Sequence, residues 1–358
     1  MILFIVQEYN SFSGGGVISH RNLSVCKNIF GEENVTTFHL PARRGGIHTF
    51  IEFSTFYLLG LNKKLEQEIL NKIASLPALK YVFLEYSLLG RLVPLIKRSF
   101  PHIRVIVFFH NVEIVYFKSF LKTSKRYLHS IGLPATAYNE RKAIKNADTI
   151  IALNRRDSEM LYFQYGRGAD LILPTSVTDT FDEQALVPVI PQQPLTLLFV
   201  GSRFFPNEQG VKWFIEEVMP HLKNAKLQIV GKGFEDLRNV WSRNNIEVIG
   251  AVDDLASYYY NADIVIAPIF TGSGMKTKTA EALMYGKTIA ATSEAFEGYD
   301  IDKNAVGAEL NDSERYIDFI NTFQHSGPYK FNKISREIYK SKYTLASVSG
   351  HLLSYLSS

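Results

Sequence analysis

The sequence is poor in cysteine and in uninterrupted apolar runs. Cys26 is the one cysteine among 358 residues, so no internal disulfide can form and we expect a reducing, cytoplasmic setting. The first apolar run, residues 2–6, has no basic leader and ends at two polar residues, which favours a first strand over a signal peptide. The run at 81–96 contains Glu85 and Arg91 and is too charged to span lipid. We therefore predict neither a secretion signal nor a transmembrane helix.

Common motifs for phosphate loops and for metal sites are also missing. The glycines at 14–16 have neither the Gly-x-Gly-x-x-Gly spacing nor the Lys-Ser/Thr ending of a P-loop. No cluster of His and Cys has metal-ligand spacing, and the pair Asp253-Asp254 lacks it as well. Asp300-Ile301-Asp302 does not directly follow an expected strand. We therefore expect no metal and no bound cofactor.

Length and composition indicate a globular protein with two domains. A chain of 358 residues with 46% hydrophobic and 21% charged residues can bury two cores, and wholesale disorder is excluded. Residues 1–180 hold 22 Lys and Arg against 14 Asp and Glu, whereas the remainder holds 17 against 21. The basic N-terminal half is consistent with contact to an anionic membrane face or an acidic acceptor, and equally with ordinary solvated charge. We expect no nucleic-acid partner.

Apolar runs alternate with helical patterns along the whole chain, which predicts an α/β protein with parallel sheets and helices on both faces. The proline-rich stretch 182–194 is the expected linker between a domain at 1–181 and a domain at 195–340, followed by a C-terminal helix in 341–358. Ligands of such sheets gather beyond the carboxyl ends of the strands. The expected strands are residues 2–6, 35–38, 81–84, 103–109, 149–153 and 170–173, then 195–200, 227–230, 246–249, 262–267 and 288–292.

The most informative stretch is residues 268–286, where an expected strand end is followed by a glycine turn and a helix. The glycines before Met275 cannot continue the strand, a helical pattern begins at Met275, and Gly286 stands where a C-cap glycine belongs. Free backbone N–H groups at a helix start favour an anion, phosphate above all. Lys276 and Lys278 oppose the helix dipole there unless an anion binds, so the pattern predicts a phosphate site.

This stretch also carries a resemblance to a known family. Read from Gly272, it runs Gly-Ser-Gly-x-Lys-x-Lys-x-x-Glu-Ala-Leu, which is similar to the donor-binding signature of the retaining glycosyltransferases of family 4. The resemblance implies a GT-B fold, in which two Rossmann-like domains face each other across a cleft and a C-terminal helix crosses back to the first domain. It also implies that Glu281 meets the nucleotide ribose. Ser273 stands where many relatives have a first glutamate for the sugar hydroxyls, so the donor sugar stays open.

Two places in the first domain gain a function from the resemblance. His110 begins the sequence His-Asn-Val-Glu directly after the strand at 103–109. By position alone a structural hydrogen-bonding role is commoner, but in the family the matching histidine faces the donor sugar. Gly15 and Gly16 by themselves fit a tight strand-to-helix turn, whereas a glycine pair at this place lines the cleft in the family. The resemblance therefore implies that His110 positions the sugar and that the two glycines approach the donor or the acceptor.

The second domain supplies the remaining expected contacts. Arg203 precedes Pro206-Asn207, as in family members whose loop contacts the diphosphate, and a plain surface role is the alternative. Val252 follows a strand at the place where the backbone of relatives meets the nucleobase. The resemblance assigns catalysis to His110, Lys278 and Arg203, which would stabilise the leaving diphosphate without a metal. It assigns binding of a UDP- or GDP-linked sugar to Gly15, Gly16, Val252, Ser273, Gly274, Met275, Lys276 and Glu281.

Basic and aromatic residues alternate over residues 116–128, which include Lys118, Lys122, Lys125 and Arg126. Such a segment fits a helix lying on a membrane surface. It also fits a helix packed on the sheet with its lysines in water, and we favour the packed helix.

The residues and the resemblance together predict a metal-independent, retaining glycosyltransferase of hexosyltransferase type, cytoplasmic and peripheral at the inner face of the plasma membrane. It would move a sugar from a nucleotide-diphosphate sugar to a glycan or lipid-linked acceptor, in bacterial surface polysaccharide or glycoconjugate synthesis. Two alternatives stay open. A sugar-nucleotide epimerase of the same architecture would need acid/base carboxylates near the sugar, and a non-catalytic GT-B partner subunit would explain the missing first glutamate.

Overall fold

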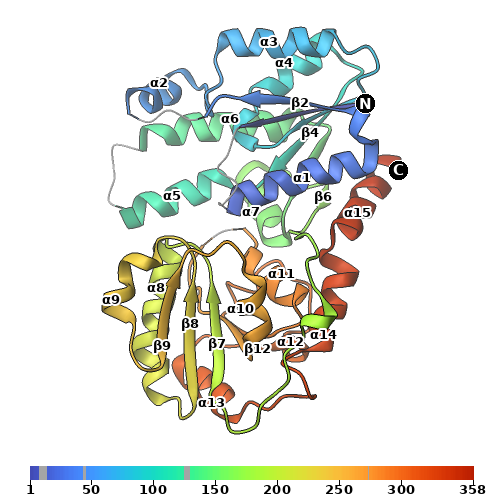
Figure 1. Ribbon diagram of the computed structural model, residues 1–358. Helices are drawn as coiled ribbons and strands as arrows, with labels where there is room; N and C mark the ends of the chain where they lie inside the picture. Colours follow the sequence, from blue (N-terminus) through green and yellow to red (C-terminus); the bar gives the residue numbers. More distant parts are fainter. Residues whose placement is uncertain (8–13, 43–45, 125–129, 273) are drawn as a thin grey trace. The chain divides into compact units, whose positions relative to one another are not determined.

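The computed structural model describes residues 1–7, 14–42, 46–124, 130–272 and 274–358 (Figure 1). Contacts divide the chain into two units, one of Met1–Pro174 with Val348–Ser358 and one of Thr175–Ser347. Each unit has a six-stranded sheet with helices packed around it. The predicted α/β class with two Rossmann-like units is therefore confirmed.

The first unit is built on an all-parallel sheet with the strand order β2-β1-β3-β4-β5-β6. Its central strands are near-continuous apolar runs because both faces are covered, and Phe4 of β1 stacks on Phe83 of β3 with ring centroids 5.0 Å apart. The strands are β1 Ile2–Gln7, β2 Val35–Leu40, β3 Tyr81–Leu84, β4 Arg104–Phe109, β5 Thr149–Ala152 and β6 Leu171–Ile172. The helices are α1 Gly14–Phe30, α2 Ile47–Thr55, α3 Lys63–Ala74, α4 Leu92–Ser99, α5 Glu113–Ser124, α6 Gly132–Asn146 and α7 Arg155–Tyr165.

The second unit is built on a parallel sheet with the order β12-β11-β10-β7-β8-β9. Its strands are β7 Leu195–Val200, β8 Ala225–Val230, β9 Ile246–Gly250, β10 Ile264–Ala267, β11 Thr288–Ala291 and β12 Gly307–Glu309. Its helices are α8 Phe205–Trp213, α9 Arg238–Trp241, α10 Ala256–Asn261, α11 Thr277–Met284, α12 Lys303–Val306, α13 Ser313–Thr322 and α14 Lys333–Ile338.

The boundary between the units differs from the expected linker at 182–194. Contacts place it at Pro174, because the proline-rich stretch packs within the second unit. Pro188 forms an isolated bridge with Tyr329, and the backbone N–H of Val189 donates to the carbonyl of Pro328 at 2.8 Å. At the other end of the chain, α15 Leu345–Ser357 is grouped with the first unit from Val348 onward. This grouping agrees with the expected return of the C-terminal helix to the first domain.

The segment predicted at 116–128 is a packed helix as far as the structure describes it. Ile114 and Leu121 of α5 are buried, and α5 packs against α6. Residues 125–129, with Lys125 and Arg126, lie outside the described residues. Within the described ranges, no helix combines the length and the apolar character needed to cross a bilayer.

In both sheets the strands are parallel, so all their carboxyl ends lie at one edge of the sheet. In the first unit this edge carries the residues that follow β3 and β4. In the second unit it carries the loops after β7, β9, β10 and β11. The candidate site residues come from these two edges.

Candidate functional site

The start of α11 is the centre of the candidate site in the second unit. β10 is fully buried, and α11 begins at Thr277, two residues later than the sequence pattern predicts. Lys276 is therefore the N-cap residue, with an extended backbone, and the hydroxyl of Tyr299 donates to its carbonyl oxygen at 2.7 Å. Gly286 follows the helix end with a φ of 59°, which confirms the predicted C-cap glycine.

Lys278 is a buried cation in the first turn of α11. Its side chain is 8% exposed, its Nζ donates to Oδ1 of Asn207 at 2.8 Å, and the same Nζ lies 4.3 Å from the centre of the Phe199 ring. Burial lowers the pKa of Lys278 to about 7, and the nearby charge of Glu281 opposes this shift only in part. In the described part of the chain, no carboxylate forms an ion pair with Lys278. The ammonium group is thus held by neutral partners.

Two glycines and one asparagine shape the space around Lys278. Asn207 lies in the first turn of α8, and its Nδ2 donates to the carbonyl of Ser202 at 2.7 Å, which turns Oδ1 toward the lysine. A Cβ on Gly201 would stand 2.9 Å from both Asn207 Nδ2 and Lys278 Nζ. A Cβ on Gly210 would stand 1.7 Å from the carbonyl oxygen of Pro268, so α8 lies directly against the chain that leaves β10.

Lys276 does not fit the expectation of two unmatched charges at the helix start. Its Nζ donates to Oε1 of Glu294 at 2.8 Å and to the carbonyl of Gly274 at 3.0 Å. Glu294 follows β11, far from Lys276 in sequence, and so the sequence pattern did not reveal the pairing. The predicted conflict with the helix dipole is therefore confined to Lys278.

Arg203 and Val252 stand at the same sheet edge as Lys278. Arg203 follows β7, and its guanidinium donates to Glu208 Oε2 at 2.7 Å and to Asp236 Oδ2 at 3.1 Å. Val252 follows β9 and is partly exposed. The structure thus places both residues where the sequence predicts, with the Arg203 guanidinium already in contact with two carboxylates.

Glu281 lies on α11, one turn after Lys278, and is half-buried. The hydroxyl of Tyr259 donates to its Oε2 at 2.8 Å, and the Tyr259 ring stacks on Tyr285 with centroids 4.6 Å apart. Burial raises the pKa of Glu281, while the Tyr259 hydrogen bond and the Lys278 charge oppose the rise. Tyr259 holds one carboxylate oxygen, so the orientation of this side chain is fixed.

In the first unit, His110 forms a buried network with Glu85, a residue that the sequence analysis did not select. Glu85 follows β3, has no exposed surface, and its Oε1 lies 2.8 Å from His110 Nε2. Asn22 of α1 donates from Nδ2 to both carboxylate oxygens, at 3.0 and 3.1 Å. Because a carboxylate only accepts, Nε2 of His110 donates, and Nδ1 is the ring nitrogen that can accept.

Aromatic rings fix the plane of the His110 ring. Tyr86 stacks on it with centroids 4.9 Å apart, and Phe108 meets it edge to face at 5.0 Å. The Tyr86 hydroxyl is 2.6 Å from Ser19 Oγ on α1. Arg21 is buried nearby; burial lowers its pKa to about 10, and the charge of Glu85 opposes the shift. The His110 ring is therefore held by Tyr86 on one face, by Phe108 through an edge-to-face contact, and by Glu85 at one nitrogen.

The glycine pair near the N-terminus lies in a helix and not in the predicted loop. Gly15 and Gly16 lie inside α1, which begins at Gly14, and not in a loop before it, because the first turn of a helix tolerates glycine.

Gly274 has a φ of 64° in the turn before α11. Met275 is buried, and its Sδ accepts from the backbone N–H of Thr175 at 3.4 Å. Ser273 lies outside the described residues.

The partners that hold these side chains leave little signal in the sequence. Asn207 is part of the Pro206-Asn207 pair, and Tyr259 stands in a run of three tyrosines without a distinctive signal. Glu85 had a usable signal, because an acidic residue directly after an apolar strand is as unusual as the histidine after β4. Asn22 carries no comparable signal in its helical pattern.

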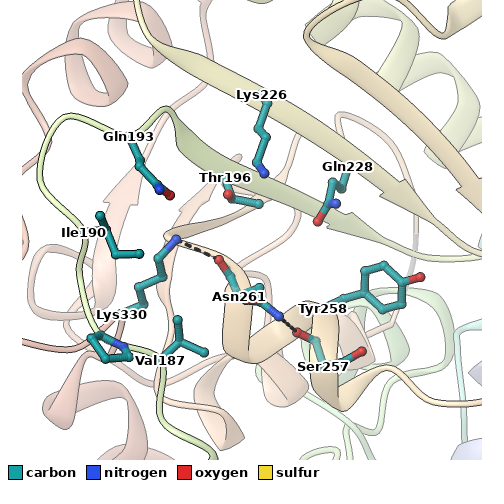
Figure 2. Close-up of a pocket in the computed structure, with 11 residues that line it drawn as sticks. Val187, Ile190, Gln193, Thr196, Lys226, Gln228, Ser257, Tyr258, Asn261 and Lys330 are labelled. Carbon is teal, nitrogen blue, oxygen red and sulfur yellow. Dashed lines mark hydrogen bonds between the residues drawn. The ribbon is translucent and has the colours of Figure 1, made fainter.

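A separate pocket of the second unit has a volume of about 400 Å³ and includes none of the predicted site residues (Figure 2). Thr196 and Lys226 line it from near the amino-terminal ends of β7 and β8, and Gln228 lines it from the middle of β8. Lys330 points toward Asn261, whose carbonyl accepts from its Nζ at 3.1 Å, and the same Nζ pairs with Asp263. The pocket thus lies at the other end of these strands from Gly201.

Comparison with known families identifies part of the second unit. Residues 194–323 match the family model described as "Glycosyl transferases group 1", a range that covers all strands of the second sheet. A 44.6 kDa protein in the cps region of Klebsiella pneumoniae is 23% identical over 270 residues, which cover 67% of this chain and 66% of that protein. The match thus spans just under two thirds of the relative's length.

Solved structures show the same fold over the whole chain. Anabaena Alr3699/HepE in complex with UDP and glucose has a TM-score of 0.67 at 13% identity, with 99% of both chains covered. The apo form of the lipopolysaccharide outer core galactosyltransferase WaaB has a TM-score of 0.66 at 12% identity, with 100% of both chains covered. The fold is that of the GT-B glycosyltransferases.

Proposed function

We propose that the chain, whose fold and group 1 domain support a glycosyltransferase, is a retaining hexosyltransferase of family 4 type that uses a UDP- or GDP-linked sugar. The observation that carries this proposal is the ammonium group of Lys278, buried at the start of α11 against an amide and an aromatic ring. A buried cation held by neutral partners is costly. A diphosphate beside Lys278 would supply the missing negative charge.

We assign the donor contacts to residues along the same sheet edge. Lys278 and Arg203 stabilise the leaving diphosphate, and Glu281 binds the ribose with the oxygen that Tyr259 does not hold. The backbone near Val252 meets the base. Gly274, Met275 and Lys276, together with Ser273 before them in the sequence, bind the phosphates and the sugar.

The transfer step needs stabilisation of charge on the leaving group more than a strong base. The bond between the anomeric carbon and the donor phosphate oxygen breaks, and its electron pair stays on that oxygen. The acceptor hydroxyl bonds to the same face of the carbon and gives its proton to the leaving phosphate. His110, oriented by Glu85, accepts a hydrogen bond from a sugar hydroxyl through Nδ1, and Gly15 and Gly16 approach the donor or the acceptor. No metal is required in this scheme.

The acceptor we propose is a glycan or a lipid-linked glycan of a bacterial surface polysaccharide or glycoconjugate. The cps region of the Klebsiella pneumoniae relative supports this class. The UDP and UDP-glucose complexes of the Anabaena protein support a nucleotide-sugar donor. We place the enzyme in the cytoplasm, peripheral to the inner face of the plasma membrane, in keeping with its basic N-terminal half.

A thermal-unfolding panel of UDP-, GDP- and ADP-linked sugars tests the proposal. We expect a UDP- or GDP-linked sugar to raise the melting temperature, and the same sugar to be transferred with its anomeric configuration kept. A panel in which no nucleotide sugar shifts the melting temperature would contradict the assignment. Release of an isomerised donor without any acceptor would point to an epimerase, and tight donor binding without turnover against an acceptor panel to a partner subunit.

A further inference from the structure

The outer face of α6 carries an apolar hollow bordered by cations. It belongs entirely to the first unit and shares no residue with the candidate site. The hollow has a volume of about 460 Å³ and is lined by Phe56, Pro134, Ala137, Tyr138, Arg141, Lys142 and Lys145.

The lining residues form one stripe along the helix. Pro134, Tyr138, Arg141 and Lys145 follow one another at steps of three or four residues, so they share one face of α6. All four are exposed. Asn139 stands on the opposite face and is fully buried. The stripe is therefore the solvent side of a helix whose other side belongs to the core.

Phe56 forms a fixed aromatic wall of the hollow. It ends α2 with a φ of 62°, a left-handed conformation that costs energy for a residue other than glycine. Its carbonyl oxygen accepts from Asn139 Nδ2 and from Arg91 Nη1, both at 3.1 Å. Its ring meets Tyr138 edge to face, with centroids 5.3 Å apart. Two hydrogen bonds thus hold the backbone of Phe56, and the contact with Tyr138 places its ring against α6.

The cations that line the hollow have no acidic partners in the parts of the chain that are described. Arg141, Lys142 and Lys145 form no ion pair there, and Lys142 Nζ lies 5.5 Å from the centre of the Tyr138 ring. The neighbouring α2, which packs on α6, exposes Ile47, Phe50 and Ile51. Their exposed fractions are 67%, 54% and 48%. Positive charge and apolar surface therefore occur together on these two helices.

We propose that this face of α6, with the hollow at its centre, docks on an anionic phospholipid surface. Arg141, Lys142 and Lys145 would contact headgroup phosphates, while Tyr138 and Phe56 lie at the boundary of headgroups and acyl chains. A soluble polyanion would satisfy the cations but would gain nothing from the apolar lining. The inference deepens the proposed membrane contact and names a surface other than residues 116–128, but it does not depend on the donor site.

Co-sedimentation of the full chain with vesicles tests the surface. We expect binding to phosphatidylcholine vesicles that contain phosphatidylglycerol, weak binding to phosphatidylcholine alone, and a decrease with added salt. Arg141→Glu with Lys145→Glu should weaken partitioning at least about tenfold. The matched control is Lys63→Glu with Lys80→Glu, which reverses two exposed charges of the same unit outside the hollow and should change partitioning little. Tyr138→Ala should weaken partitioning less than the charge reversal does.

For each variant, the shift in melting temperature caused by UDP is also measured. A variant that loses vesicle binding but keeps this shift has a defect in the α6 surface and not in the donor site. If charge reversal prevents folding, Arg141→Gln with Lys145→Gln replaces it. Equal partitioning of wild type and the stripe variants would overturn the proposal. Loss of binding to a soluble anionic oligosaccharide, with vesicle binding unchanged, would assign the stripe to a soluble polyanion and overturn it as well.

Discussion

The two units hold buried charge at their sheet edges in opposite ways. In the first unit, the carboxylate of Glu85 receives hydrogen bonds from both Asn22 and His110, so the buried charge is satisfied inside the protein. In the second unit, the ammonium of Lys278 has an amide oxygen and a ring face, and in the described residues no carboxylate is in contact with it.

This difference separates a buried carboxylate whose oxygens are already hydrogen-bonded from a buried cation that awaits an anionic ligand. A satisfied buried carboxylate fixes its partner, here the His110 ring, and rigidifies the place where it stands. A desolvated cation with neutral partners gains the most when an anion arrives, because water is already removed around it. We therefore expect the sheet edge of the first unit to act by orienting the His110 ring. The sheet edge of the second unit should act through the charge of Lys278.

The largest effect should come from Lys278→Met, which keeps the apolar stem and removes the charge. UDP affinity should fall by about 10- to 150-fold, since a hydrogen bond to a charged group is worth about 1.5–3 kcal/mol. The melting temperature should not fall, because a buried cation without an acidic partner is removed. Calorimetric titration with UDP and thermal unfolding measure the two quantities. Lys226→Met, on an exposed lysine of the same unit, is the control and should change neither.

Glu85→Gln tests whether the first edge works through orientation. The glutamine side chain can either accept a hydrogen bond from the His110 ring or donate one to it. The ring nitrogen that faces residue 85 is then no longer fixed as a donor. We expect kcat to fall about tenfold or more, with UDP affinity unchanged. Steady-state kinetics with a separate UDP titration distinguishes the two. Glu68→Gln on α3 is the control, and equal losses of kcat and UDP affinity would contradict a purely orienting role.

The pH dependence of UDP binding should follow Lys278. Its pKa is lowered from 10.5 to about 7, so above pH 7 the free protein holds a neutral amine that must take up a proton to meet the diphosphate. UDP affinity should therefore fall by up to about tenfold per pH unit above 7. The unfolded chain still holds this proton up to its ordinary pKa of 10.5, so this group makes the free protein more stable as the pH rises from about 7 to that value. Both slopes should vanish in Lys278→Met; a variant that kept them would contradict the assignment.

The smallest effect on the donor should come from Lys276→Met, because Glu294 already matches this charge. We expect a loss of about 1 kcal/mol of unfolding free energy as the ion pair between Lys276 and Glu294 is removed, and only a few-fold loss of UDP affinity. Adding Glu294→Gln should restore much of the stability. A loss of UDP affinity as large as that of Lys278→Met would remove the distinction drawn between the two lysines.

The sequence predicted the architecture well, because buried parallel strands are continuous apolar runs bounded by turns. Each of the expected strands is present, and the strand that was missed, β12, has three residues and leaves no periodic signal. The start of α11 was placed two residues early, since Met275 has helical propensity but its side chain turns to Thr175. The boundary between the units was misplaced because prolines mark an irregular chain without saying which unit it packs on.

The chemical groups of the site were easier to predict than their partners. His110, Lys278 and Glu281 stand next to glycines or strand ends, and such places are visible in sequence. Their partners come from distant segments: Glu85 for His110, with Asn22 in turn bonded to Glu85, and Asn207 for Lys278. Pairing across such separations is set by the packing of helices on the sheet, which no local pattern encodes. The roles of the site residues stay predictions until donor binding is measured.

Gly210 has a consequence for attempts to change donor preference. Because α8 touches Pro268 there without room for a methyl group, the helix that carries Asn207 and the turn that leads to Lys278 cannot adjust independently. A mutational library that varied Gly210 would separate them and yield mostly inactive clones. Variation is better tolerated around Val252, which stands on a different strand end and is partly exposed. Selection for a new nucleotide should therefore begin at that loop and leave the α8 contact intact.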